Sequence, residues 1–213
     1  MVNMNDMRSV KVTIPALPIG NAAAVANMVR MCGGEAIITA NPQDLLHARR
    51  VILAGVGAFD AGMCALERGG WLEYVHKIAQ EGEVAILGIC LGMQLMCRSS
   101  EEGVLPGLGW FDAVVKRIQP PPTLGLKVPH MGWNTIRILN PHATLAKTHD
   151  EQRFYFVHSY HVVCDNPSDA VATVSYGGDL IASIARNRLI GVQFHPEKSH
   201  RFGTEFMKRF LAL

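Results

Sequence analysis

The sequence predicts an α/β fold built around a mostly parallel β-sheet, and two observations lead to this fold class. In the first half of the chain, short apolar runs alternate with segments of helical periodicity, which is typical of βαβ units. The apolar runs are bounded by glycine, as is typical of strands that are buried on both faces. Strands are expected at 10–14, 36–39, 51–54 and 84–88, and helices at 21–31 and 71–79.

The second half of the chain has a different pattern. From Trp110 to Phe194 the apolar runs are strand-like and are separated by turn signals such as the prolines at 120–122 and the glycine pair at 177–178. This pattern predicts antiparallel strands added to the sheet, followed by an amphipathic helix at 204–213. Because no repeat or linker interrupts the chain, residues 1–213 are expected to form a single domain.

Composition excludes several classes of protein. Hydrophobic residues make up 49% of the 213 residues and charged residues 18%, which excludes a disordered chain. The net charge of +2 argues against electrostatic binding to nucleic acid or to an anionic membrane. The first dozen residues lack the apolar core of a secretory signal, and the longest apolar stretch, 84–97, is interrupted by Gln94. A cytoplasmic protein is therefore expected, and its five cysteines are expected to be reduced.

One cysteine lies in a distinctive segment, Gly88-Ile-Cys90-Leu-Gly92, directly after the apolar run 84–88. This is the G-x-S-x-G nucleophile elbow with cysteine in place of serine. A sharp strand-to-helix turn exposes the sulfur at the carboxyl end of the sheet, and flanking glycines permit strained backbone angles there. A helix that begins near Leu91 favours the thiolate, and the N–H of Leu91 is expected to be an oxyanion donor. The other cysteines lack this context and are expected to be structural.

A second oxyanion donor is expected from the glycine-rich segment Gly55-Val56-Gly57, which follows the preceding strand. Backbone N–H groups of such a loop can approach a substrate closely. The segment is not a dinucleotide-binding fingerprint, because Asp60 occupies the third glycine position and the loop does not follow the first strand. A purely structural turn stays an alternative.

A base and a residue to orient it are expected in the segment Gln193-Phe-His195-Pro-Glu197. Residues two apart in an extended segment project to the same side, so His195 and Glu197 can face one site. Thiol chemistry needs a general base and a group that fixes the imidazole tautomer, roles that suit His195 and Glu197 respectively. The alternative is a histidine and a glutamate on the surface at a strand end.

A metal site is not expected. The pair His158-x-x-His161 has its members on opposite faces of a strand, with no cysteine or carboxylate cluster beside it. Neither a metal nor another cofactor is therefore expected.

Two of these segments resemble the signature pair of the class I, triad-type glutamine amidotransferases: Gly88-Ile-Cys90-Leu-Gly92-Met-Gln94 and Gln193-Phe-His195-Pro-Glu197. Further motifs are similar to those of the glutaminase subunits of imidazole glycerol phosphate synthase. They are Gly55-Val-Gly57-Ala-Phe59, Ser100-Glu-Glu102-Gly103, Pro129-His-Met-Gly-Trp133-Asn134, Phe156-Val-His158-Ser159-Tyr160 and the extension to Lys198-Ser199. The resemblance covers nearly the whole chain, from Gly20-Asn21 to the C-terminal helix.

The resemblance implies a flavodoxin-like α/β fold and a function. Cys90 would attack the side-chain amide of L-glutamine, with His195 as acid and base and Glu197 as the orienting residue, and water would hydrolyse the thioester to L-glutamate. Val56 or Gly57, together with Leu91, would supply the oxyanion donors. The residues implied to bind the two ends of glutamine are Gln94, Glu102, His158, Ser159 and Tyr160.

The resemblance also implies a partner. The ammonia would pass to a TIM-barrel cyclase subunit in a heterodimer that acts in histidine biosynthesis, with Trp133 and Asn21 at the interface. A buried aromatic side chain is an equally open interpretation of Trp133. The chain departs from the family in its first loop, where 14–20 reads Ile-Pro-Ala-Leu-Pro-Ile-Gly in place of a segment like Ile-Asp-Tyr-Gly.

Three alternatives stay open on the sequence. The first is a related glutaminase that feeds another synthase, such as a sugar-amidating enzyme. The second is a cysteine peptidase or deglycase-like protein that uses the same elbow, which Gln94 and the His195–Glu197 pair disfavour. The third is a binding subunit without catalytic activity, which the presence of all three triad residues disfavours.

Overall fold

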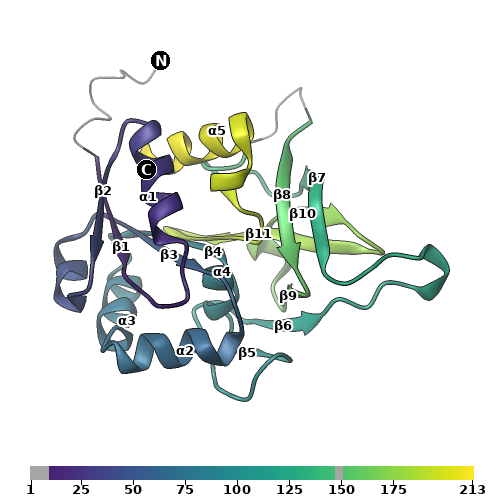
Figure 1. Cartoon of the computed structure of the whole chain (residues 1–213), viewed down its shortest axis with the longest axis horizontal. Coiled ribbons are helices and arrows are strands. Elements are labelled where there is room, and N and C mark those ends of the chain that lie inside the picture. The colour runs from purple at the N-terminus through teal and green to yellow at the C-terminus, as the bar shows by residue number, and fades with distance from the viewer. Residues whose placement is uncertain (1–9, 147–150) are drawn as a thin grey trace.

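A nine-stranded sheet forms the centre of the computed structural model, which describes residues 10–146 and 151–213 (Figure 1). The strand order is β2-β1-β3-β4-β12-β11-β10-β7-β8. These strands are β1 (Lys11–Pro15), β2 (Glu35–Thr39), β3 (Arg50–Gly55), β4 (Ala85–Cys90), β7 (His130–Ile138), β8 (Arg153–His158), β10 (Ala170–Ser175), β11 (Asp179–Arg186) and β12 (Leu189–Val192).

The sheet divides into a parallel part and an antiparallel part. Strands β2, β1, β3, β4 and β12 pair in parallel, and β12, β11, β10, β7 and β8 pair antiparallel. The parallel first half and the antiparallel second half predicted from the sequence are thus confirmed. β12 differs from that prediction, because it returns to the centre of the sheet and pairs in parallel with β4.

Two strands of the second half do not join the main sheet. β6 (Ala113–Arg117) and β9 (Tyr160–Cys164) pair with each other, and the short β5 (Ser99–Ser100) pairs with β6, which forms a separate three-stranded sheet. The several antiparallel strands that the sequence adds to the main sheet are β7, β8, β10 and β11, whereas β6 and β9 pair outside it. Their buried residues Ala113, Val115 and Val162 belong to the apolar cluster beneath the main sheet, so packing there stabilises the second sheet.

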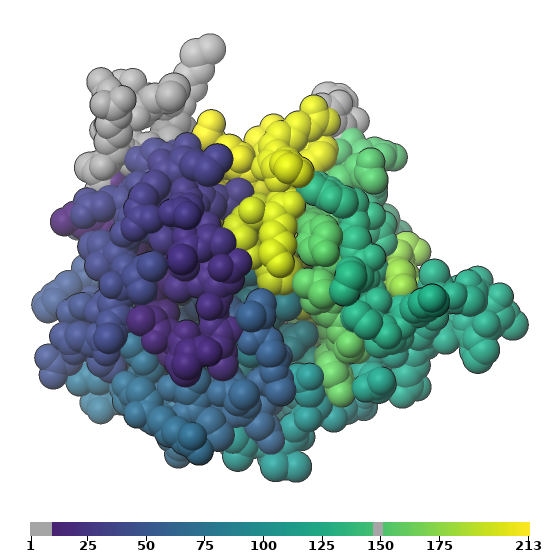
Figure 2. Space-filling view, viewed as in Figure 1, coloured from purple at the N-terminus to yellow at the C-terminus, as the bar shows by residue number. Residues whose placement is uncertain are grey.

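Helices cover both faces of the parallel part. α1 (Ala22–Met31) and α5 (His200–Leu211) lie on one face, and α2 (Phe59–Arg68) and α3 (Leu72–Glu81) lie on the other (Figure 1). Alternate side chains of β3 pack on opposite faces of the sheet. Ile52 packs in the apolar cluster with α1 and α5, and Leu53 packs in the cluster with α2 and α3. In Figure 2, α5 lies at the surface between the N-terminal half and the strands of the C-terminal half.

Shorter helical segments complete the fold. They are α4 (Leu91–Leu95) and the 3-10 helices η2 (Pro42–His47), η3 (Pro122–Leu124), η4 (Pro167–Asp169) and η5 (Pro196–Lys198). The final helix begins at His200, four residues before the predicted start. Within the described residues, no helix combines the length and the apolar character needed to cross a membrane. The expectation about a secretory signal depends in part on residues 1–9, which lie outside the described residues.

Candidate active site

The predicted elbow forms between β4 and α4. Cys90 ends β4, Leu91 begins α4, and Cys90 has a positive φ of 53°, a strained conformation for a residue other than glycine. The flanking glycines serve close packing and have no positive φ themselves. A Cβ atom at Gly92 would lie 1.8 Å from the carbonyl oxygen of Leu53, and one at Gly88 would lie 2.6 Å from the carbonyl group of Gly92. The two glycines therefore allow α4 to pack directly onto the strands that carry Cys90.

Helix α4 is only five residues long. The sequence predicted a helix start near Leu91, and the structure confirms it, but a helix of one to two turns has a smaller dipole than a full-length helix. The environment of the Cys90 sulfur therefore depends mainly on its side-chain neighbours. Cys90 is 8% exposed, so those neighbours act in a largely water-free setting.

His195 and Glu197 are in direct contact. Nδ1 of His195 lies 2.8 Å from Oε1 of Glu197, and their side chains are 1% and 3% exposed, which excludes the alternative of a surface pair. The backbone differs from the extended segment that the sequence suggested, because Pro196 and Glu197 lie in η5, which begins directly after His195. The contact is made across this tight turn.

Strand pairing brings His195 to the same edge of the sheet as Cys90. β12 ends three residues before His195 and pairs in parallel with β4, where Val192 is opposite Ile89. Parallel neighbours end at one edge of a sheet, so residues that follow them meet there. Cys90 and His195 both line one pocket of about 460 Å³ at this edge.

The pKa of His195 is set by opposing effects. Burial lowers the pKa of the imidazole, but the neighbouring Cys90 sulfur and the Glu197 carboxylate together outweigh it and raise the pKa from 6.5 to about 9. Among the described residues, Nε2 of His195 has no hydrogen-bond partner. His195 is therefore held through Nδ1 and keeps Nε2 available for proton transfer at neutral pH.

The pocket contains every residue that the sequence analysis assigned to catalysis, oxyanion binding or substrate binding, except Glu197, which lies behind His195. The lining residues are Val56, Gly57, Ala58, Cys90, Leu91, Gln94, Glu102, Pro129, Val157, His158, Ser159, Tyr160 and His195. These come from the ends of several strands and the loops that follow them.

The two candidates for the second oxyanion donor differ in their hydrogen bonding. The N–H of Val56 donates to the carbonyl oxygen of Ile19 at 2.7 Å, so it is already engaged. Gly57 has a φ of 112° and open space where a Cβ would be, and its N–H donates to no protein acceptor among the described residues. In this conformation the structure favours Gly57 over Val56. The hydrogen bond to Ile19 also joins the unusual first loop to the pocket wall.

Three of the expected substrate-binding residues have side-chain polar atoms that are engaged within the protein. Both ring nitrogens of His158 are hydrogen-bonded, at 2.8 Å to the carbonyl of Tyr160 and at 2.9 Å to His130, so its ring has no free polar atom for a ligand. Nε2 of Gln94 donates to Gln193 and to the carbonyl of Tyr160. Glu102 accepts from the N–H of Phe59, the first residue of α2, at 2.9 Å. Each of the three therefore shapes the pocket, and Glu102 also caps α2.

Gln193 is the site residue that sequence reasoning missed. It lies in the motif two residues before His195, and the motif alone indicates no role for it. Its side chain is completely buried, and Nε2 lies 3.5 Å from Sγ of Cys90. An uncharged polar residue in a run of buried apolar positions was the signal that could have found it.

The two expected interface residues lie outside the pocket. Trp133, on β7, is 40% exposed and stacks on His200 with 5.3 Å between ring centroids, which excludes the alternative of a buried aromatic side chain. Asn21 precedes α1 and makes no capping hydrogen bond through its side chain. Both are available at the surface for a partner. In the residues that the structure describes, no group of three or more histidine, cysteine or acidic side chains could hold a metal ion.

Comparison with known proteins assigns the family. The glutamine amidotransferase class-I family matches residues 21–213. The chain is 40% identical over 195 residues to the imidazole glycerol phosphate synthase subunit HisH 2 of Pseudomonas aeruginosa, a match that covers 92% of this chain and 96% of that protein. The chain belongs to the class-I glutamine amidotransferases and, within them, to the HisH family. A HisH protein of Synechococcus elongatus is 41% identical over 91% of this chain and 89% of its own length.

Two solved structures of low sequence identity share the fold of this HisH family member. A protein from Thermoplasma acidophilum, described as one subunit of a putative GMP synthase, has a TM-score of 0.69 at 17% identity, and the match covers 95% of this chain and 92% of its own. The structure of PurLQS from Thermotoga maritima gives the same TM-score at 18% identity, with 95% and 97% covered. The family match favours a glutaminase over the peptidase alternative.

Proposed function

We propose that this chain is the glutaminase subunit of an imidazole glycerol phosphate synthase, with Cys90, His195 and Glu197 as its catalytic triad. It would hydrolyse L-glutamine to L-glutamate and ammonia and pass the ammonia to a cyclase subunit. The observation that carries this proposal is that Cys90 and His195 line one pocket, with Glu197 in contact with Nδ1 of the imidazole.

The first half of the proposed reaction forms a thioester. The Cys90 thiolate attacks the side-chain carbonyl carbon of glutamine, and the carbonyl oxygen becomes an oxyanion that the N–H groups of Leu91 and Gly57 stabilise. Since Glu197 accepts from Nδ1–H of His195, the proton that leaves with the amine comes from Nε2. The carbon–nitrogen bond breaks, ammonia departs and the thioester remains.

The second half restores the enzyme. His195, now neutral, removes a proton from water through Nε2, and the hydroxide attacks the thioester carbon. The carbon–sulfur bond breaks, glutamate leaves, and Cys90 and His195 return to their starting states. The raised pKa of His195 fits both steps, because an imidazolium is stable beside a thiolate and Glu197 at neutral pH.

Substrate binding is proposed for other residues that line the pocket of the nucleophile. The hydroxyl groups of Ser159 and Tyr160, the free amide oxygen of Gln94 and backbone groups of the pocket suit the α-amino and α-carboxylate groups of an amino acid. His158 contributes through its backbone and its shape, because its ring nitrogens are engaged.

The experiment that tests the triad is the variant Cys90→Ala in the complex reconstituted with the cyclase. It should abolish imidazole synthesis from glutamine and leave synthesis from added ammonium salts intact, because only the first requires the thioester. Cys64→Ala is the matched control, since Cys64 is a partly buried cysteine on α2 outside this pocket. Equal loss with both nitrogen sources would show that Cys90 is structural.

The proposed partnership has its own test. Glutaminase turnover should be low for the chain alone and should rise when the cyclase is added, because free hydrolysis would waste ammonia. Trp133 and Asn21 are the proposed contacts, so Trp133→Ala should raise the cyclase concentration needed for half-maximal stimulation. Fast hydrolysis that is insensitive to the cyclase would contradict the partnership and favour another synthase as the acceptor of ammonia.

A further inference from the structure

Gln193 places a hydrogen-bond donor against the proposed nucleophile. Its Nε2 lies 3.5 Å from Sγ of Cys90, and the side chain is 0% exposed. A sulfur is a weak acceptor when it is a thiol and a much stronger one when it is a thiolate, because the thiolate carries a full negative charge. A donor fixed at this position therefore stabilises the reactive form of the sulfur more than the resting thiol.

The orientation of the Gln193 amide follows from its other contact. Nε2 of Gln94 lies 3.3 Å from the carbonyl oxygen of Tyr160, a group that can only accept, so the atom of Gln94 that faces it must be the nitrogen. The same nitrogen lies 3.1 Å from the Gln193 amide, whose atom on that side must therefore be the oxygen. This leaves the Gln193 nitrogen, with its hydrogens, facing Cys90.

A pair of histidines extends the same argument away from the pocket. His158 and His130 are directly opposite each other on β8 and β7, and both are buried. Nδ1 of His158 must donate to the carbonyl of Tyr160 at 2.8 Å, and burial lowers the pKa of His158 to about 3, so its ring is neutral and Nε2 is an acceptor. His130, whose pKa burial lowers to about 4, then donates from Nδ1 to that nitrogen at 2.9 Å.

The last link is Asn134. Since Nδ1 of His130 carries the proton, Nε2 of His130 accepts from Nδ2 of Asn134 at 3.2 Å, and the same Nδ2 donates to the carbonyl of Ser175 at 3.0 Å. We call Asn134, His130, His158, Gln94 and Gln193 the amide–histidine chain. Its two arms meet at the carbonyl oxygen of Tyr160, which accepts from Nε2 of Gln94 and from Nδ1 of His158. Gln94 therefore sets the orientation of the Gln193 amide, and the histidine arm holds the Tyr160 carbonyl that orients Gln94.

We propose that Gln193 is a positioning residue that holds the Cys90 sulfur toward the pocket and stabilises its thiolate, and that Gln94, oriented by the Tyr160 carbonyl, fixes Gln193 in the donating orientation. This inference rests on the proposed role of Cys90 as nucleophile. Gln193 directly follows β12 and its amide faces the sulfur, whereas His195, two residues later, shares the pocket with Cys90 and has no hydrogen-bond partner at Nε2 among the described residues, so the two residues make separate contributions.

The other groups that can influence the charge of Cys90 are those that share its pocket or stand directly behind it. They are His195 with Glu197 behind it, His158 at the end of β8, Tyr160 on β9 and Glu102 in the loop after β5. Among these only His195 is a cation at neutral pH, and the substitutions below keep it in place.

The test is the pH dependence of Cys90 alkylation in the full-length chain, with iodoacetamide as the probe and peptide mapping to identify the labelled cysteine. Gln193→Met removes the donor but keeps the length of the side chain. It should raise the pH of half-maximal alkylation of Cys90 by about one to two units, because the free energy of a hydrogen bond to a charged group corresponds to a shift of about that size. In the complex, glutamine-dependent kcat/KM should fall roughly 10- to 100-fold while ammonium-dependent synthesis is unchanged.

Gln152→Met is the matched control. Gln152 donates to the carbonyl of Ala146, and neither residue lines the pocket, so this variant should keep the alkylation profile of the parent chain. Gln193→Glu is the second variant, because a carboxylate of the same shape repels a thiolate. It should shift the alkylation profile at least as far as Gln193→Met does.

The outcomes separate this inference from the proposed function. If Cys90→Ala retains glutamine-dependent activity, Cys90 is not the nucleophile and the proposed function fails. If Cys90 is required but both folded Gln193 variants keep the parent alkylation profile, only the role of Gln193 is overturned. If Gln193→Met does not fold, Gln94→Met tests the same orientation, and an unchanged profile there overturns the proposal.

Discussion

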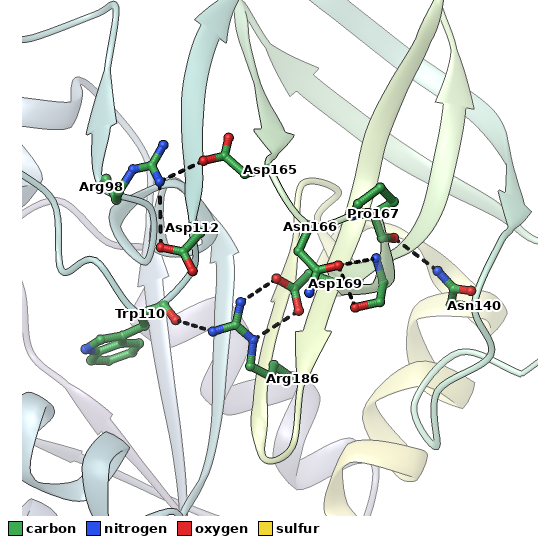
Figure 3. A network of polar contacts seen from close by, with 10 residues as sticks. Arg98, Trp110, Asp112, Asn140, Asp165, Asn166, Pro167, Asp169 and Arg186 are labelled. Atoms are coloured by element: carbon green, nitrogen blue, oxygen red, sulfur yellow. Dashed lines mark hydrogen bonds and ion pairs between the residues drawn. The ribbon is translucent and has the colours of Figure 1, made fainter.

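Two polar networks of this protein differ in the charge of their members, because one consists of charged side chains and the other of neutral ones. The first is the arginine–aspartate network, which consists of Arg98, Asp112, Asp165, Asp169 and Arg186 and is drawn with its neighbours in Figure 3. Arg186 on β11 donates to both carboxylate oxygens of Asp169, at 3.0 and 2.5 Å, and to the carbonyl of Trp110 at 3.3 Å. Charges of both signs meet there because water still reaches most of the side chains.

The amide–histidine chain has no charged member. It lies largely inside the protein, where an unpaired charge would be costly, and its two histidines are neutral because burial lowers their pKa values. The comparison shows two ways to tie strands together with polar groups. Ion pairs in which the arginine is partly exposed form the first network, whereas directional neutral hydrogen bonds lead to the buried Cys90–His195–Glu197 cluster.

The largest effect is expected where a neutral amide replaces the charge in that cluster. Glu197→Gln should reduce glutamine-dependent turnover on the order of 10³- to 10⁴-fold, because an amide can donate to Nδ1 of His195 and favour the wrong tautomer. Steady-state glutaminase assays of the complex measure this effect, and ammonium-dependent synthesis is the internal control. A loss of less than tenfold would mean that Glu197 does not orient His195.

A medium effect on stability is expected from the arginine–aspartate network. Asp169 is 3% exposed, and Asp169→Ala leaves Arg186 without its two charged hydrogen bonds. The free energy of unfolding should fall by about 1–3 kcal/mol, a range that takes account of the partly exposed Arg186. Urea unfolding measures it, and glutaminase activity at low temperature should be unchanged.

Arg98→Ala is the matched control for Asp169→Ala. Arg98 pairs with Asp165 at 2.8 Å and with Asp112 at 3.6 Å, but all three side chains are well exposed. Exposed ion pairs contribute little to stability, so the unfolding curve should match that of the parent chain. Equal destabilisation by Arg98→Ala and Asp169→Ala would mean that the buried and exposed ends of this network contribute alike.

The smallest effect is a pH dependence that belongs to the amide–histidine chain. His130 and His158 have native pKa values of about 4 and about 3, below the ordinary 6.5, so between about pH 4 and 6.5 the unfolded chain binds protons that the native chain does not. The free energy of unfolding should therefore fall as the pH drops below 6.5. Nitrogen-15 NMR at pH 5.5 should find both imidazole rings neutral with the proton on Nδ1. An imidazolium signal from either histidine would contradict the hydrogen-bond directions assigned to this network.

Much of the fold could be predicted because buried parallel strands leave a strong trace in a sequence. The run expected at 36–39 is β2, Glu35–Thr39, and the run expected at 51–54 is β3, Arg50–Gly55. The separate sheet of β6 and β9 could not be predicted, because local periodicity identifies a strand but not its partner. The pairing of β9 with β6 depends on where the chain turns away at Ser159.

The candidate active site could likewise be predicted from the sequence only in part. Motif spacing predicted that Cys90, His195 and Glu197 would meet, because the elbow and the His-Pro-Glu segment each have a local signature. It did not predict the contact of Gln193 with Cys90 or the pairing of His130 with His158. These depend on the register of β12 beside β4 and of β7 beside β8, which no short segment of sequence encodes.

The direct pairing of β4 with β12 has a consequence for how this architecture can diversify. Cys90 ends β4 and His195 follows β12, and these two strands are neighbours in the sheet. The spacing of the sulfur and the imidazole is therefore determined by the main-chain hydrogen bonds between the two strands. Nearly a hundred residues separate those strands along the chain, and they include the exposed Trp133 and the second sheet. Evolution can therefore change the long segment between β4 and β12 to suit a new acceptor of ammonia without changing the distance over which the proton is transferred.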